Sequence, residues 1–196
     1  MTMFNHPVQL AIEHLKHTAR IHVVTRLVLL AAFAALGCSG LYWFLYLALP
    51  ALAAVEILRK GGDRYLAEDA PQVVRVLRWF ASAYGYLWLL TDFLPTADGS
   101  PVDLRVEVGG HPTAGSALLR LLFSVPALAL LVLLSLVAGV LWIAGAVLIL
   151  VRERIPGAVV DFLAFTLRFQ FQLVAYHLSL VDAYPSLRTD RVAHAT

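Results

Sequence analysis

Two long apolar runs dominate the pattern of hydrophobic and polar positions along the chain. Residues 27–58 contain a single charged residue, Glu56, and residues 121–151 contain none. About 20 apolar residues suffice for a helix to cross the hydrocarbon core of a bilayer. Each run therefore predicts a transmembrane helix with length to spare, which tilt or a kink at Pro50 or Pro126 can absorb.

Two further stretches, residues 71–94 and 157–181, are long enough to span a membrane but carry ionisable side chains. Taken alone, either is equally compatible with an amphipathic helix lying at the membrane interface. We expect both to span, because they occupy matching places in an internal repeat.

The repeat shows as an ordered series of identical residues. Pro7, Glu13 and Arg26 recur 94 positions later, and Arg78, Tyr86, Asp92 and Pro95 recur 90 positions later, as Pro101, Glu107, Arg120, Arg168, Tyr176, Asp182 and Pro185. The longer first hairpin, residues 59–70, accounts for the change of offset. The series predicts two tandem units, residues 1–98 and 99–196, each contributing two membrane helices.

Each unit opens with a short alternating segment. Val102, Leu104 and Val106 alternate with polar residues, and residues 8–12 show the same period of two, which is typical of a half-buried strand. We expect the two segments to pair antiparallel at the membrane surface. An amphipathic helix over residues 8–20 remains open as an alternative.

Two helices per unit would return the chain to the side on which it started. The fold class predicted is therefore all-α integral membrane, with four transmembrane helices from a tandem parallel repeat and a small two-stranded surface element. Both termini then lie on one side, and the distribution of Lys and Arg favours the cytoplasm by a small margin.

Composition narrows the class of protein further. Sixty per cent of the residues are hydrophobic and 14% are charged, whereas soluble domains carry about 25% charged residues. The net charge of +2, without a basic run, gives no indication of a nucleic-acid partner. The single cysteine, Cys38, excludes an internal disulfide and a Cys-based zinc site.

The second helix of each unit carries a polar stripe at helical spacing. The candidate intramembrane residues are Arg78, Ser82 and Asp92 in the first unit and Asp161, Arg168, Gln172 and Asp182 in the second. An arginine deep in a bilayer costs about 2.5–3.5 kcal/mol on insertion scales, so Arg168 needs a partner: another helix, a carbonyl, water or the other unit.

Two interpretations of the stripes stay open. They line a polar path for an ion, a proton or a lipid headgroup, or they hold the units together. We favour the structural interpretation, because no proton relay is visible. Asp92 and Asp182, just before Pro95 and Pro185, are expected to organise turns at helix ends.

Catalytic and metal signatures are missing from the sequence. His14 and His17 have the spacing of metal ligands on a helix, but no acidic or Cys ligand accompanies them. We therefore predict no metal site, no cofactor and no catalytic residues. Common motifs of hydrolases, kinases and dinucleotide enzymes are absent, so an enzyme is not expected.

The repeated pieces resemble an uncharacterised bacterial membrane-protein family, domain of unknown function 4389. The motifs that carry the resemblance are Val76-Leu77-Arg78-Trp79, Leu89-Leu90-Thr91-Asp92, Leu167-Arg168-Phe169 and Asp182-Ala183-Tyr184-Pro185. The sequence departs from the family pattern at Gly61-Gly62-Asp63-Arg64 and at Phe93-Leu94-Pro95. The resemblance implies two tandem copies of the family's two-helix unit in a bacterial inner membrane, and no assigned activity.

The expected function is that of a structural or accessory subunit of a membrane complex. The alternative is a small transporter or lipid-handling protein that uses the Arg/Asp stripes at the repeat interface. The expected partners are the lipid bilayer and other membrane subunits or further copies of the chain.

Overall fold

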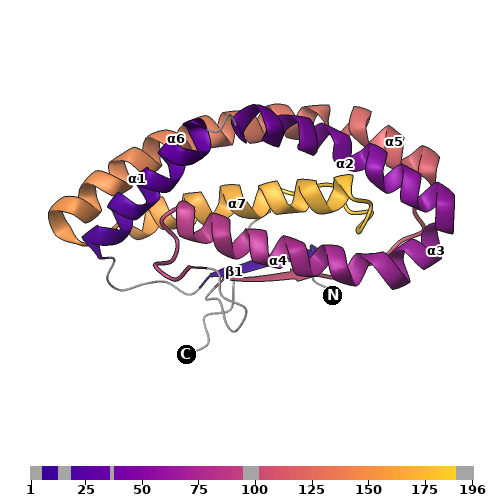
Figure 1. Ribbon diagram of the computed structural model, residues 1–196, viewed down its shortest axis with the longest axis horizontal. Coiled ribbons are helices and arrows are strands. Elements are labelled where there is room, and N and C mark those ends of the chain that lie inside the picture. Colours follow the sequence, from indigo (N-terminus) through magenta and orange to yellow (C-terminus); the bar gives the residue numbers. More distant parts are fainter. Residues whose placement is uncertain (1–5, 13–18, 36–37, 95–101, 189–196) are drawn as a thin grey trace.

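The computed structural model describes residues 6–12, 19–35, 38–94 and 102–188 (Figure 1). The first half of the chain contains, in order, strand β1 (Val8–Ile12) and the helices α1 (Arg20–Ala35), α2 (Cys38–Lys60), α3 (Gly62–Arg64), the π-helix η1 (Tyr65–Asp69) and α4 (Ala70–Leu87). The second half contains strand β2 (Val102–Val106) and the helices α5 (Ala114–Phe123), α6 (Val125–Arg152) and α7 (Gly157–His177).

The two strands form an antiparallel pair, which confirms the predicted two-stranded element. Leu10 lies opposite Leu104, and the ends match Val8 with Val106 and Ile12 with Val102. Val8, Leu10, Val102 and Leu104 are buried, while the alternate positions turn outward. The amphipathic-helix alternative is therefore wrong for residues 8–12; residues 13–18 lie outside the described part of the chain.

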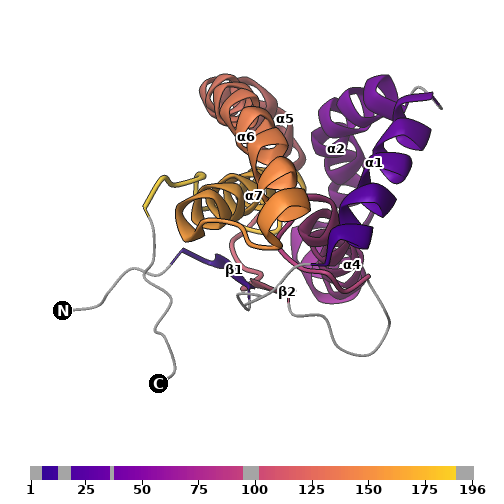
Figure 2. The same cartoon turned by 90° about the vertical axis from the view of Figure 1, so that its left-hand side faces the viewer.

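Figures 1 and 2 show three layers. Helices α1, α2, α5 and α6 form one outer layer, α4 and α7 lie beneath it, and the small sheet lies against the far side of α4 and α7. Helix α7 runs through the middle, with Leu163, Leu167 and Leu173 fully buried. The main core lies between α7, α4 and the sheet.

The two halves run in opposite directions along the molecule. Helix α1 packs on α6, the later part of the second half, and α2 packs on α5, its earlier part. Tyr65, just before α4, contacts Leu178, just after α7, so these two helices are antiparallel as well. The corresponding long helices of the two halves therefore run antiparallel to each other, so a two-fold axis that relates the halves is perpendicular to these helices (Figure 1).

The prediction of four transmembrane helices also needs correction. Two helices in the described part of the chain, α6 and α7, are long and apolar enough to cross a membrane. Residues 71–94 yield α4, whose 18 residues include Arg75 and Arg78, and the helix ends at Leu87. The polar side chains that made this stretch ambiguous in the sequence also make α4 too polar to count as a membrane-spanning helix.

The apolar run of residues 121–151 is divided near its start. Helix α5 ends at Phe123 and α6 begins at Val125, with Pro126 in its first turn. Proline lacks the N–H that would continue the helix, and its ring clashes with the carbonyl four residues earlier. Because Ser124 keeps helical dihedral angles, α5 and α6 follow one another as a long bent arm.

Candidate functional site: two buried arginine clusters

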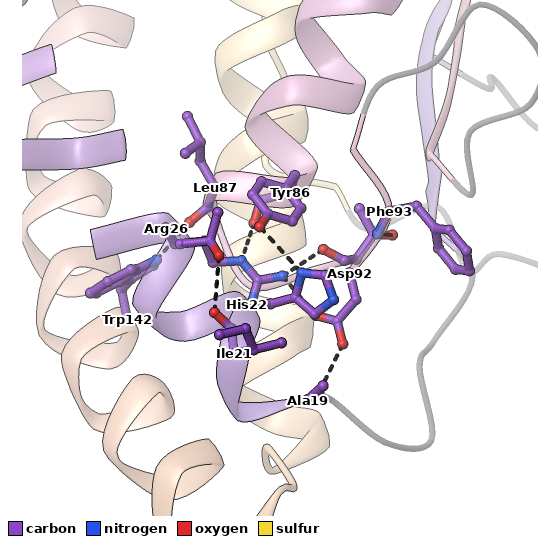
Figure 3. A network of polar contacts seen from close by, with 11 residues as sticks. Ala19, Ile21, His22, Arg26, Tyr86, Leu87, Asp92, Phe93 and Trp142 are labelled. Atoms are coloured by element: carbon purple, nitrogen blue, oxygen red, sulfur yellow. Dashed lines mark hydrogen bonds and ion pairs between the residues drawn. The ribbon is translucent and has the colours of Figure 1, made fainter. Parts of the chain in front are cut away.

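The polar centre of the first half is built around Arg26 of α1, whose side chain is completely buried (Figure 3). Its Nε donates to the carbonyl of Tyr86 at 2.6 Å. Its Nη2 donates to the carbonyl of Thr91 at 2.6 Å and to Asp92 Oδ1 at 2.8 Å. The guanidinium also lies 4.6 Å from the centre of the Tyr86 ring, a cation–π contact.

Neighbouring groups extend this first cluster to three helices. The Ala19 backbone N–H, just before α1, donates to Asp92 Oδ2 at 3.0 Å. The Trp142 indole of α6 donates to the Leu87 carbonyl at 2.8 Å. A hydrogen bond of 3.3 Å joins His22 and the Tyr86 hydroxyl. The end of α4 is thereby fixed to both α1 and α6, as Figure 3 shows.

Arg120 of α5 makes the corresponding contacts in the second half. Its Nη1 donates to the carbonyls of Tyr176 and Val181, and its Nη2 pairs with Asp182 Oδ1. The guanidinium lies 4.7 Å from the centre of the Tyr176 ring. The two clusters therefore contain the same residue types, an Arg, a Tyr and an Asp. The backbone carbonyls that accept from the arginine also lie at equivalent positions in the two halves.

The backbone at the ends of α4 and α7 explains why those carbonyls are available. Leu89 has φ 63° and Ser179 has φ 56°, so both adopt the left-handed conformation that often terminates helices. Each turn is closed in the same way, by Leu90 N–H to Gly85 carbonyl and by Leu180 N–H to Ala175 carbonyl, both 3.0 Å. The chain then presents further carbonyls to the arginine.

Each arginine sits at the negative end of a helix dipole, where a cation is favoured. Its hydrogen bonds to fixed carbonyls and to its aspartate hold the guanidinium between the helix ends. The clusters differ in exposure, since the Asp92 side chain is 15% exposed and that of Asp182 is 56% exposed. Gly110, with φ 106°, packs so close to the Asp182 carboxylate that a Cβ there would collide with it.

The predicted stripe residues Arg78, Ser82 and Gln172 belong to the sheet side of the second layer. Arg78 Nε donates to the Leu104 carbonyl of β2 at 3.0 Å, and the Ser82 hydroxyl donates to the Arg78 carbonyl at 3.1 Å. Gln172 is buried; its amide reaches the Val8 carbonyl at 3.5 Å and accepts from Ser186 N–H at 3.0 Å. These groups connect the helices to the strands and to the C-terminal segment.

The other stripe candidates lie apart from these and from one another. Arg168 Nη2 donates to the Arg188 carbonyl at 3.2 Å, and Asp161 is exposed near the start of α7. Asp92 and Asp182 lie at opposite ends of the molecule, because α4 and α7 are antiparallel. The structure thus distributes the seven candidates over the sheet face and the two ends.

Arg26 and Arg120 centre the two clusters, although the sequence pattern predicts them only as markers of the repeat. A signal for the clusters is present in the sequence, because each arginine recurs together with a Tyr and an Asp at matching positions. A repeated Arg at the head of an apolar helix needs a repeated acidic partner, and Asp92 and Asp182 supply it.

Tyr65 adds a further link between the ends of the two halves. Its hydroxyl donates to the Leu178 carbonyl at 2.6 Å. Burial raises the pKa of Tyr65 to about 12, so the phenol remains protonated and able to donate under ordinary conditions.

Among the described residues, no group of three or more His, Cys, Asp or Glu side chains is placed to hold a metal ion. His14 and His17 lie outside the described part of the chain.

A family model described as a domain of unknown function, DUF4389, matches residues 115–187. The matched segment begins within α5 and ends just after α7, and includes Arg120, Tyr176 and Asp182. Residues 115–187 are therefore similar to this family. No curated protein and no solved structure matches the chain.

Proposed function

We propose that the chain is a membrane-embedded structural protein that acts as an accessory subunit of a membrane complex. The observation that supports this proposal is the set of contacts that the two buried arginines make. Both guanidinium groups are directed to backbone carbonyls and an aspartate of their own half, as clamps between helix ends. Clamps of this kind hold an architecture together.

The outer helix layer supports membrane embedding. Helix α6 is 28 residues long, and 17% of its most apolar stretch is buried inside the molecule. Soluble monomers rarely expose a contiguous apolar patch of more than a few hundred Å². Such a helix needs lipid or a partner helix around it.

We also propose that the chain holds two copies of the family's unit, of which the family model matches the second. The equivalent contacts of Arg26 and Arg120, and the pairing of β1 with β2 about Leu10 and Leu104, support a duplication with an approximate two-fold axis through the sheet. A bacterial inner membrane is the location that the family resemblance favours.

The test is purification of a tagged chain from its native membranes in a mild detergent, after cross-linking in the intact membrane. The accessory-subunit proposal predicts a stoichiometric partner protein, with cross-links that map to α6. An Arg26→Met variant should lower the amount of assembled complex, and a matched Arg105→Met change, on an exposed side chain, should not.

Two outcomes would contradict the proposal. Recovery of the chain alone, without cross-links to any protein, would favour transport or lipid handling instead. Normal assembly of the Arg26→Met variant with loss of a solute or lipid flux would show that the arginine serves a path.

A further inference from the structure

We propose that the molecule lies within one leaflet of the bilayer, with its long helices parallel to the membrane plane and its sheet facing water. This inference rests on the proposed membrane embedding and specifies its geometry. The occupant of the outer apolar layer is then the acyl chains of that leaflet.

The path of the chain between the halves is the first argument. Helix α4 ends at the Arg26 cluster, and α5 begins at the opposite end of the molecule, beside Gly62. Strand β2 lies between them and pairs with β1, which runs the other way along the same axis (Figure 1). If the long helices stood upright in the bilayer, both strands would run upright within the hydrocarbon too.

A two-stranded sheet cannot cross hydrocarbon at an acceptable cost. Its outer edges carry backbone groups that lipid cannot hydrogen-bond, which is why only helices and closed barrels span membranes. The outward face of this sheet also carries Asp103 and Arg105, an exposed ion pair at 2.8 Å. Intramembrane charges of this kind are expensive, so the sheet belongs in water or among headgroups.

The second argument is that the whole molecule has two unlike faces. The layer of long helices exposes large aliphatic side chains, among them Ile21, Val28, Leu122, Leu133, Leu136 and Val140, each more than 60% exposed. The sheet lies on the other side of α4 and α7 (Figure 2). An amphipathic body with this division fits the interface of a single leaflet, as amphipathic helices do on a smaller scale.

Charge at the rim is the third argument, and it fits lipid as the occupant. Exposed ion pairs stand at both ends of the apolar layer: Arg20 pairs with Glu153 at one end, and Arg59 pairs with Glu56 at the other. Arg152 and Arg154 add exposed positive charge beside the first pair, and anionic headgroups attract basic residues. A molecule lying flat places the charged groups of both ends at the same headgroup level.

The experiment uses single cysteines in the full-length chain, with Cys38→Ser as the background. Arg64→Cys and Arg154→Cys report on the two ends, Asp103→Cys on the sheet, and Leu136→Cys on the apolar layer. A membrane-impermeant thiol reagent is added either to spheroplasts or to inverted membrane vesicles. A permeant reagent on denatured protein controls for intrinsic reactivity, and membranes are washed with alkaline carbonate to establish that the chain is embedded.

The proposal predicts that Arg64→Cys, Arg154→Cys and Asp103→Cys are labelled from one and the same side, while Leu136→Cys is protected until detergent is added. Labelling of the two ends from opposite sides, with the chain retained after carbonate, would overturn the in-plane geometry and leave membrane embedding standing. Release by carbonate, with Leu136→Cys labelled before detergent, would overturn both.

Discussion

At the scale of single residues, the ion pair of Arg26 and Asp92 has one partner fully buried and the other nearly so. Removing one member of a buried pair leaves an uncompensated charge, at a cost of about 3–5 kcal/mol. We expect Asp92→Ala to lower the free energy of unfolding by that amount, measured by denaturant titration in detergent micelles.

The matched control is Asp103→Ala, which breaks the exposed ion pair with Arg105. Exposed pairs contribute about 0–1 kcal/mol, so this variant should remain close to the unsubstituted chain. Equal effects of the two substitutions would show that the Arg26 cluster does not act as a clamp.

Ser179 holds two unfavourable features in one residue. It adopts the left-handed conformation with φ 56°, and its buried hydroxyl has no hydrogen-bond partner within the described structure. Relief of the backbone conformation and removal of the hydroxyl should together outweigh the entropy that glycine loses on folding. We expect Ser179→Gly to raise the unfolding free energy by about 1 kcal/mol.

Ser124 provides the comparison for that substitution. It is also buried, but its backbone is helical and its hydroxyl donates to the Leu121 carbonyl at 2.9 Å. Ser124→Gly should therefore destabilise the protein in the same measurement. A loss of stability in both variants would refute the explanation given for Ser179.

At the scale of elements, Tyr65 links the start of the α4 segment to the end of α7. Its pKa is raised from 10.0 to about 12, which means that folding favours the protonated phenol. The stability that it contributes is fully present below pH 10 and is lost as the pH rises through about 12.

We therefore expect the chain to lose stability as the pH rises from about 10 to about 12, and Tyr65→Phe to lose less over that interval. At neutral pH the same variant should be destabilised by about 1 kcal/mol, since the Leu178 carbonyl loses its donor. Unfolding curves collected across the pH series measure both effects. Identical pH profiles for the two proteins would contradict this role.

The sheet register makes a prediction of its own. Ala11 lies directly opposite Asp103, with both residues on the outward face. Directly opposed residues in an antiparallel pair have Cβ atoms about 4.5–5.5 Å apart, close to the spacing of a disulfide. Cysteines at Ala11 and Asp103, with Cys38→Ser, should form a disulfide that mass spectrometry detects after proteolysis.

The control pair joins Gln9→Cys to Asp103→Cys, which are two positions out of register. It should oxidise much less readily under the same conditions. Preferential linkage of the control pair would show that the strands pair in a different register.

Local elements were the part of the fold that the sequence could predict. Alternation over residues 8–12 and 102–106 reports which side chains are buried, because strand periodicity and burial are directly linked. The apolar run of residues 121–151 and the weaker stretch of residues 157–181 likewise predicted helices close to α6 and α7. Periodicity does not report which element packs on which, so the antiparallel pairing of the long helices was not accessible.

For the candidate site, the sequence could likewise predict the needs of single residues but not their arrangement in space. Arg168 was expected to need a partner such as a carbonyl, and its Nη2 donates to the carbonyl of Arg188; Arg78 Nε donates to the carbonyl of Leu104. Helical spacing places the stripe residues on one face of a single helix. In the structure the sheet covers part of that face, and Asp92 lies beyond the end of α4. The stripe is therefore divided among separate environments that spacing alone cannot distinguish.

At the scale of the whole molecule, the two faces should respond differently to the same substitution. Leu163 in α7 is fully buried, whereas Leu136 in α6 is 64% exposed. We expect Leu163→Ala to lower the unfolding free energy by about 2–5 kcal/mol, because it leaves a cavity.

Leu136→Ala should change the same quantity little, since detergent or lipid fills the space. Unfolding of both variants in identical micelles provides the measurement. A large loss at Leu136 would mean that α6 is covered by protein, through a second copy or a partner, and would assign the outer layer to an interface.

The pairing of β1 with β2 has a consequence for the order of events during synthesis. Leu10 meets Leu104, so the first strand leaves the ribosome long before its partner exists. At about 5–20 residues per second, the delay is roughly 5–20 s. During that interval the first half cannot finish its own sheet, and its arm of apolar helices needs protection from aggregation. Delivery to the membrane while the ribosome is still translating would provide that protection, with the sheet closing afterwards as the last step of assembly.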